Sequence, residues 1–184
     1  MQLSLCEPSD AKCKPTIGYL TQYIKYKGCN FEIWDVGASD KIRFLFKHYY
    51  SEMDAFIYVV DSNDRERFEE SAGFLKEIIN AEETQKKPIL IMANKQDLET
   101  ALAPEEIAQK LGNEQFKGRD WNIIGTSKKG KGIIESLDWL FLVLTGDKDE
   151  LKNKEIKELK EELSKSKKII EELKNRINIL ENKL

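Results

Sequence analysis

Ile89-Leu90-Ile91-Met92-Ala93-Asn94-Lys95-Gln96-Asp97 is the stretch that decides the fold, because a run of five apolar residues leads directly into a polar tetrapeptide. A continuous apolar run of this kind predicts a strand buried on both faces of a sheet. Polar residues that directly follow such a strand lie at its carboxyl end, where open α/β sheets bind their ligands. The stretch therefore predicts an α/β domain with a binding loop at residues 94–97.

The side chains of this loop suit a guanine base. One carboxylate, that of Asp97, can accept two parallel hydrogen bonds from the ring N–H and the 2-amino group of guanine. The apolar stem of Lys95 can lie over the flat base, and Asn94 can brace the loop or meet N7. Taken alone, the tetrapeptide is explained as well by a charged turn.

A second candidate loop, Thr126-Ser127-Lys128, follows the apolar run at residues 121–125. Loops that leave neighbouring strands of such a sheet converge at one edge. The backbone N–H of Ser127 could then donate to the guanine carbonyl, and Lys128 could cover the other side of the base. A solvated, lysine-rich turn at residues 128–132 is the better explanation when this loop is considered by itself.

Upstream, residues 31–38 predict a strand that ends in a carboxylate followed by small residues. A single strand-end carboxylate such as Asp35 can hold Mg²⁺ through water, and the N–H groups of Gly37 and Ala38 can approach a terminal phosphate closely. The hydroxyl of Thr16 could complete the metal shell, although a threonine in a Pro/Gly turn is usually only a turn residue.

The order of these motifs resembles the ADP-ribosylation-factor (Arf and Arf-like) family of small GTPases. The matching strings span roughly residues 14 to 144 and stand at 15–18 (Pro-Thr-Ile-Gly), 34–37 (Trp-Asp-Val-Gly), 59–67 (Val-Val-Asp-Ser-Asn-Asp-Arg-Glu-Arg), 94–97 and 137–140 (Leu-Asp-Trp-Leu). Their combination is far more specific than any one of them. The resemblance implies an α/β small-GTPase (P-loop NTPase-like) fold, with a mostly parallel sheet and flanking helices, that binds GTP or GDP with Mg²⁺.

The resemblance also implies two switch segments, at about 13–20 and about 35–50, joined by an interswitch hairpin. Its strands would be Tyr19 to Lys27 and Cys29 to Asp35, with Gly28 at the turn. In the family an aromatic triad on this surface contacts protein effectors, and Tyr19, Trp34 and Tyr49 stand in the matching places. Ordinary core aromatics explain these three residues about equally well.

Two departures from the family concern the phosphates. The 184 residues contain no G-x-x-x-x-G-K-[ST] string, and the fourteen residues before Pro15 are too few for a strand, a phosphate loop and a helix. Ala38-Ser39 replaces the family's Gly-Gln, and a serine is too short to orient the attacking water. We therefore expect an incomplete fold with little or no nucleotide affinity and no catalytic residue.

The absent first strand would lie centrally in the sheet of the family, so its loss would leave backbone groups unpaired. Three outcomes are open. Residues 29–35 could pair directly with residues 54–61, the segment Gln2 to Cys6 could act as a substitute strand, or the chain could be a truncated, marginally folded product.

Composition narrows the class of protein. With 40% hydrophobic residues, 34% charged residues and a net charge of −3, neither nucleic-acid binding nor an acidic tail is indicated. No apolar run approaches the ~18 residues of a membrane span, and Met1-Gln2 lacks the second-position glycine that myristoylation needs. We expect a cytoplasmic protein without a direct lipid anchor, recruited to membranes only by a partner.

Helix signals stand between the motifs. Residues 64–80 predict a helix capped by Asn63 or Asp64, and Lys87-Pro88 precedes the next strand. Further helices are expected at 105–111, with Pro104 at the first position and Gly112 at the end, and at 133–144, closed by Gly146.

Residues 147–184 have no aromatic residue, Gly or Pro. With Ile156 at heptad position a, the later a positions are Leu163, Ile170, Ile177 and Leu184, and the d positions are Leu159, Ser166, Leu173 and Leu180. This pattern predicts a coiled coil rather than a helix folded back on the domain. Opposite charges at g and the following e′ position favour a parallel, in-register homodimer, through Glu155–Lys160, Glu162–Lys167 and Arg176–Glu181.

The sequence thus predicts an Arf-like domain at residues 1–146 and a coiled coil at residues 147–184. We expect a dimeric interaction protein with a degenerate nucleotide site, linked to vesicle trafficking. Two alternatives stay open, namely a functioning guanine-nucleotide switch with a non-standard phosphate site and a truncated product of a GTPase gene.

Overall fold

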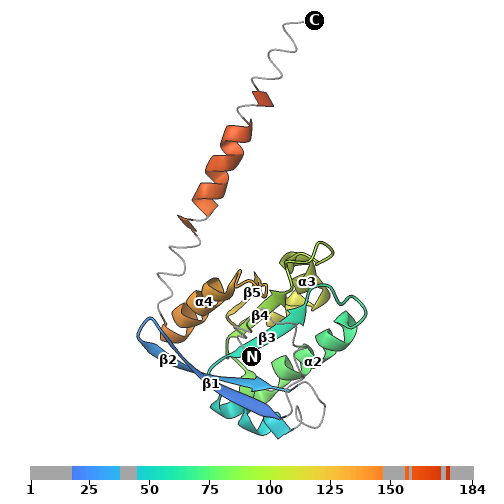
Figure 1. Cartoon of the computed structure of the whole chain (residues 1–184), viewed down its shortest axis with the longest axis vertical. Helices are drawn as coiled ribbons and strands as arrows, with labels where there is room; N and C mark the ends of the chain where they lie inside the picture. The colour runs from blue at the N-terminus through green and yellow to red at the C-terminus, as the bar shows by residue number, and fades with distance from the viewer. Residues whose placement is uncertain (1–17, 38–44, 147–155, 158, 171–172, 175–184) are drawn as a thin grey trace, which may run out of the picture. The chain divides into compact units, whose positions relative to one another are not determined.

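The structure is a computed structural model that describes residues 18–37, 45–146, 156–157, 159–170 and 173–174 (Figure 1). The chain divides into two compact units, Met1–Leu144 and Thr145–Leu184.

Three parallel strands form the centre of the first unit. β4 (Ile89–Asn94) lies between β3 (Phe56–Asp61) and β5 (Trp121–Gly125), and pairs with both. The side chains of residues 89–93 are at most 1% exposed. The predicted strand, buried on both faces, is confirmed.

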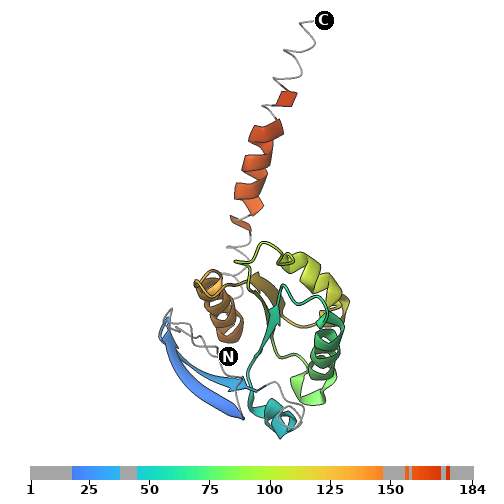
Figure 2. The same cartoon turned by 45° about the vertical axis from the view of Figure 1, so that its right-hand side comes forward.

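Helices cover both faces of this sheet. α2 (Phe68–Asn80) and α3 (Pro104–Lys110) lie on one side, and α4 (Ile133–Thr145) lies on the other (Figure 2). The main core joins β3 and β4 to α2, α3 and the short 3-10 helix η3 (Asn113–Phe116). Two further 3-10 helices are η1 (Lys47–Glu52) and η2 (Glu82–Thr84).

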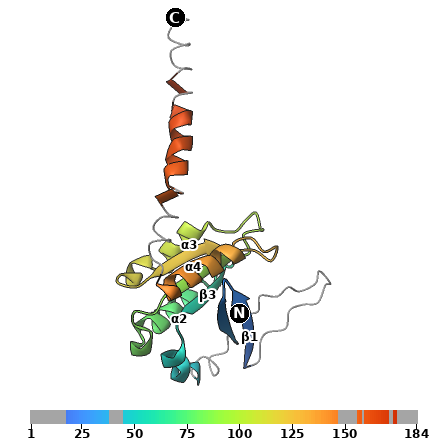
Figure 3. The same ribbon diagram turned by 90° about the vertical axis from the view of Figure 1, so that its left-hand side faces the viewer.

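An antiparallel hairpin stands apart from this sheet (Figure 3). β1 (Tyr19–Tyr26) pairs with β2 (Cys29–Val36), and the turn residues Lys27 and Gly28 have φ angles of 46° and 82°. Positive φ at both central residues gives the turn a twist that matches the flanking strands. No residue of either strand is buried, and none belongs to the main core.

The hairpin tip is tied to α4 by one carboxylate. The hydroxyl of Tyr26 donates to Asp138 Oδ1 at 2.9 Å, and Lys27 Nζ lies 2.6 Å from the same oxygen. The ammonium of Lys27 also lies 5.5 Å from the ring centroid of Phe141, within cation–π range.

Direct pairing between residues 29–35 and 54–61, the first outcome considered for the missing strand, is wrong. Among the described residues, β2 pairs only with β1, and β3 pairs only with β4. The alternative substitute strand, Gln2 to Cys6, lies outside the described residues. The described strands therefore form two separate sheets, and the family resemblance places a central strand between β2 and β3.

Most element boundaries follow their sequence signals, with one correction. Pro104 begins α3, Gly112 follows it with φ of 75°, and Gly146 follows α4 with φ of 77°. The helix predicted from residue 64 instead begins at Phe68, and neither Asn63 nor Asp64 caps it. Asp64 accepts the backbone N–H and the guanidinium of Arg67, and this turn delays the helix.

In the second unit, the described residues 156–157, 159–170 and 173–174 are helical and exposed. No described helix of the chain combines the length and apolarity that a membrane span requires.

Lys87 fixes the end of η1 against the start of β4. Its Nζ donates to the carbonyl oxygens of Tyr50 and Ser51 at 2.8 Å and of Met53 at 2.6 Å. A cation is favourable at these carbonyls because the C-terminal end of a helix carries partial negative charge. The contact holds the end of the second predicted switch segment to the central strand.

We predict that Lys87→Met lowers the free energy of unfolding by about 1–3 kcal/mol, because three carbonyls lose their charged donor. Urea unfolding followed by circular dichroism measures the change. Lys86→Met is the matched control, since the neighbouring Lys86 is exposed, and its effect should stay within about 0.5 kcal/mol. Equal effects of the two substitutions would contradict this role of Lys87.

Candidate functional site

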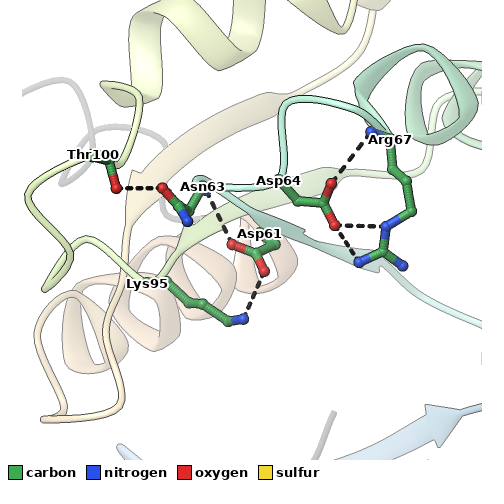
Figure 4. A network of polar contacts seen from close by, with 6 residues as sticks. All are labelled: Asp61, Asn63, Asp64, Arg67, Lys95 and Thr100. Carbon is green, nitrogen blue, oxygen red and sulfur yellow. Dashed lines mark hydrogen bonds and ion pairs between the residues drawn. The ribbon is translucent and has the colours of Figure 1, made fainter.

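Three loops leave the carboxyl ends of β3, β4 and β5 and are joined to one another. They comprise residues 61–67, 94–101 and 125–132 (Figure 4 shows the first two). The parallel order of the strands places all three ends at the same edge of the sheet. This edge carries the residues predicted to read a guanine base.

The loops after β4 and β5 are held together by backbone and side-chain hydrogen bonds. Asn94 Oδ1 accepts from the hydroxyl of Thr126 at 3.2 Å, and the N–H of Gln96 donates to the carbonyl of Thr126 at 3.0 Å. Thr126 and Ser127 are only 1% and 5% exposed. Asn94 therefore braces the loop, and the two halves of the predicted base site have a fixed separation.

Gln96 connects all three loops. Its side-chain Nε2 donates to the hydroxyl of Ser62 and to the carbonyl of Leu102, each at 2.8 Å, while its backbone N–H reaches Thr126. A Cβ atom on Gly125 would lie 3.2 Å from Gln96 Cγ, so the glycine leaves room for this side chain. Sequence reasoning missed Gln96 because its partner Ser62 lies 34 residues away and no motif links the two.

Lys95 projects from the same loop with a backbone φ of 68°. Its Nζ lies 2.6 Å from Asp61 Oδ2 at the end of β3 (Figure 4). The other oxygen of Asp61 accepts the N–H of Asn63 at 3.0 Å. The ammonium is thereby anchored, and the position of the lysine stem at the edge of the site is restricted.

The two remaining base-site residues, Asp97 and Lys128, are exposed. An exposed carboxylate can accept the two parallel donors of a guanine edge, and an exposed lysine stem can cover a flat ring. Together with Asn94, Lys95 and Ser127, these side chains come from two loops that share one edge of the sheet.

The loop after β3 has its own ion pair. Asp64 accepts Arg67 Nε at 2.6 Å, and it also pairs with Arg67 Nη2 (Figure 4). The hydrogen bond from Arg67 lowers the pKa of Asp64 and keeps the carboxylate ionised, while Asp64 raises the pKa of Arg67. The hydroxyl of Thr100 donates to Asn63 Oδ1 at 2.5 Å, which adds another tie to the loop after β4.

The residues predicted to face phosphate and Mg²⁺ are less completely described. Asp35 lies half-buried on β2 opposite Leu20, and the N–H of Gly37 donates to the carbonyl of Gly18 at 2.8 Å. Thr16 and Ala38 lie outside the described residues. Within the described part of the chain, no three His, Cys, Asp or Glu side chains gather. One carboxylate suits an Mg²⁺ ion held mainly by nucleotide phosphates and water, and does not make a metal site by itself.

Residues 125–131 (Gly-Thr-Ser-Lys-Lys-Gly-Lys) match the first seven positions of a phosphate-loop pattern, a similarity that the sequence search for the complete string missed. The loop nevertheless bonds to itself. The N–H of Ser127 donates to the carbonyl of Lys131, that of Gly130 to the carbonyl of Ser127, and that of Lys129 to the Ser127 hydroxyl. These amides are engaged within the loop, so this segment does not form a phosphate cradle.

A cluster of four aromatic rings lies on the hairpin and the residues that begin η1. Tyr19 stacks on Trp34 with centroids 5.3 Å apart and planes 12° apart, and Phe46 packs edge-on against Tyr19 at 5.4 Å. Tyr49 contacts Trp34 at 5.6 Å and Phe46 at 5.7 Å. The three predicted effector residues thus come together, with Phe46 as an addition that sequence reasoning missed. Tyr19 and Tyr49 remain 53% and 41% exposed.

Comparisons with known proteins agree with this geometry. The ADP-ribosylation factor family profile matches residues 4–144. The solved structure of an Arl6 BBS3 small GTPase from Trypanosoma brucei, with the bound nucleotide analogue GppNp, matches with a TM-score of 0.67 and 26% sequence identity. The match covers 76% of this chain and 86% of that one.

We predict that Gln96→Ala lowers the free energy of unfolding by about 1–3 kcal/mol, because the fully buried hydroxyl of Ser62 and the carbonyl of Leu102 lose their donor. Thermal and urea unfolding measure the loss. Gln109→Ala on α3 is the control, since Gln109 is exposed and alanine is a good helix former. A loss no greater than that of the control would rule out the connecting role of Gln96.

Proposed function

Because the chain belongs to the ADP-ribosylation factor family, we propose that it is a small GTP-binding protein homologue with a degenerate nucleotide site. It acts as a dimeric interaction protein in vesicle trafficking. It works in the cytoplasm, reaches membranes through a partner protein and binds no nucleic acid.

The observation that carries this proposal is the contrast between the two sides of the site. On the base side, hydrogen bonds join the loops that hold Asn94 and Ser127. On the phosphate side, the N–H of Gly37, which is predicted to face the terminal phosphate, instead donates to the carbonyl of Gly18. The base-side loops are thus held together, whereas the N–H of Gly37 on the phosphate side is already bonded within the chain.

Each base-side residue has a distinct role in the proposal. Asp97 accepts the two guanine donors, and the stems of Lys95 and Lys128 cover the two faces of the ring. Asn94 braces the loop, and the N–H of Ser127 donates to the guanine carbonyl once its bond to Lys131 opens. Where nucleotide binds, the oxygens of Thr16 and Asp35 would hold Mg²⁺, and Gly37 and Ala38 would face the terminal phosphate.

Hydrolysis requires more than binding. A GTPase positions its attacking water with a long side chain and offsets the developing charge with a lysine and Mg²⁺. The pair Ala38-Ser39 offers no such side chain, and the 184 residues hold no complete phosphate-loop string. We therefore infer negligible GTP hydrolysis by this polypeptide.

The partner-binding surface of the proposal is the aromatic cluster Tyr19, Trp34, Phe46 and Tyr49. Exposed tyrosines beside a half-buried tryptophan give a large apolar area with few rotatable bonds, a composition that protein interfaces favour. Its position on the interswitch hairpin matches the surface by which the family meets its effectors.

We predict that calorimetric titration of the 184-residue chain with GDP, with and without Mg²⁺, gives a Kd above about 10 μM, because base contacts alone cannot replace donors to the phosphates. Sub-micromolar binding would instead support the alternative, a functioning switch with a non-standard phosphate site. In that case Asp97→Asn should weaken GDP binding by at least about tenfold through loss of the bidentate acceptor, while Glu99→Gln, an exposed carboxylate in the same loop, should not.

We predict that Tyr19→Ala reduces proximity labelling of the main partner proteins in cells by at least about tenfold, because a central aromatic anchor is lost. Tyr23→Ala is the matched control. Tyr23 projects from the same hairpin face, is 74% exposed and has no ring contact with the cluster among the described residues. Equal labelling by both variants would show that partners bind elsewhere.

A further inference from the structure

The helix of the second unit has an apolar stripe without cover from the described residues. The exposed fractions of its large apolar side chains are 47% for Ile156, 64% for Leu159, 55% for Leu163, 57% for Ile169, 51% for Ile170 and 51% for Leu173. All but Ile169 stand at a or d of one heptad register. A helix with such a stripe gains most of its stability from a second surface that buries it.

We propose that this stripe is covered by the same helix of a second copy of the chain, parallel and in register. The inference rests on the dimeric part of the proposed function and names its seam and orientation, and it is independent of the nucleotide site. In sequence, Ile177, Leu180 and Leu184 continue the pattern beyond the described residues.

The flanking charges select the second copy and its direction. In a parallel pair, each g residue faces the e′ residue five positions later, so Glu155 meets Lys160 and Glu162 meets Lys167. In an antiparallel pair, e residues face e′ residues. Three successive e positions are Lys160, Lys167 and Lys174, so an antiparallel homodimer would set lysine against lysine. Opposite charges meet in the parallel pair, whereas lysines meet in the antiparallel pair. The charges therefore favour the parallel homodimer.

The single polar position of the seam has an apolar neighbour. Ser166 stands at d between Leu159 and Leu173, and Ile169 stands at g one turn after it. Because residues three apart lie on the same side of a helix, the side chain of Ile169 widens the apolar stripe beside Ser166. The seam is therefore continuous from Ile156 to Leu173.

The first test compares two neighbouring substitutions in the full chain. Leu163→Asp places a charge in the dry seam, and Ser164→Asp places the same charge on the outer face at position b. By analytical ultracentrifugation we expect a wild-type dimer, at least about a hundredfold weaker association for Leu163→Asp, and little change for Ser164→Asp. A wild-type monomer at tens of micromolar, a trimer, or equal loss in both variants would overturn the proposal.

The second test concerns orientation. Glu162→Lys and Lys167→Glu each place like charges opposite each other twice in a parallel homodimer, and each should weaken association by about tenfold. Mixing the two variants should restore dimers as heterodimers, and the double variant should restore homodimers. Recovery in neither case would refute the parallel register. A wild-type monomer that binds GDP weakly would overturn the seam and leave the nucleotide part of the proposed function standing. A wild-type dimer that binds GDP tightly would overturn the nucleotide part and leave the seam standing.

Discussion

Burial of β4 on both faces is the constraint on which the rest of the first unit depends. A strand whose side chains are inaccessible needs helices above and below it and hydrogen-bonded strands on both edges. β3 and β5 supply the edges, while α2, α3 and α4 supply the faces. The carboxyl end of the strand is therefore held in place, and this also fixes the position of the residues that directly follow it.

Rigidity is distributed unevenly around this strand. The three loops at its carboxyl edge share the side chain of Gln96, the Asn94–Thr126 bond and the Lys95–Asp61 ion pair. The hairpin has no buried residue, and its tip contacts α4 through Asp138 and the ring of Phe141. A two-stranded hairpin is marginal by itself, so local opening costs less there than at the base-side loops. Of the aromatic cluster, Tyr19 and Trp34 lie on this hairpin, whereas the base-reading residues lie on the fixed loops.

Prediction from the sequence succeeded where a single residue type or a run of apolar residues determines the local structure. The apolar run 89–93, the turn at Gly28 and the helix boundaries at Pro104 and Gly112 all follow from local rules. It failed where particular side-chain contacts decide the outcome, whether the partners are near or far in the sequence. The helix predicted from residue 64 begins at Phe68 because Asp64 satisfies Arg67 instead of a helix terminus. The contacts of Gln96, Lys87 and Phe46 all join segments that only the fold brings together, so no local sequence pattern predicts them.

The separation of the hairpin from the central sheet affects how a ligand at the base-side loops can influence the hairpin. β2 and β3 do not pair within the described residues, so the hairpin and the central sheet are separate hydrogen-bonded units. In such an arrangement, ligand contacts to the base-side loops can reach the hairpin through the segment between β2 and β3, or through α4, which follows the loop at 125–132 and contacts the hairpin tip. A ligand can shift the hairpin from one position to another only by the difference in its binding free energy between the two positions. The simplest function of the aromatic cluster is then to bind a partner protein without any nucleotide. Two copies joined by the helical seam would present this cluster twice, which raises avidity for a partner with two sites without any new contact.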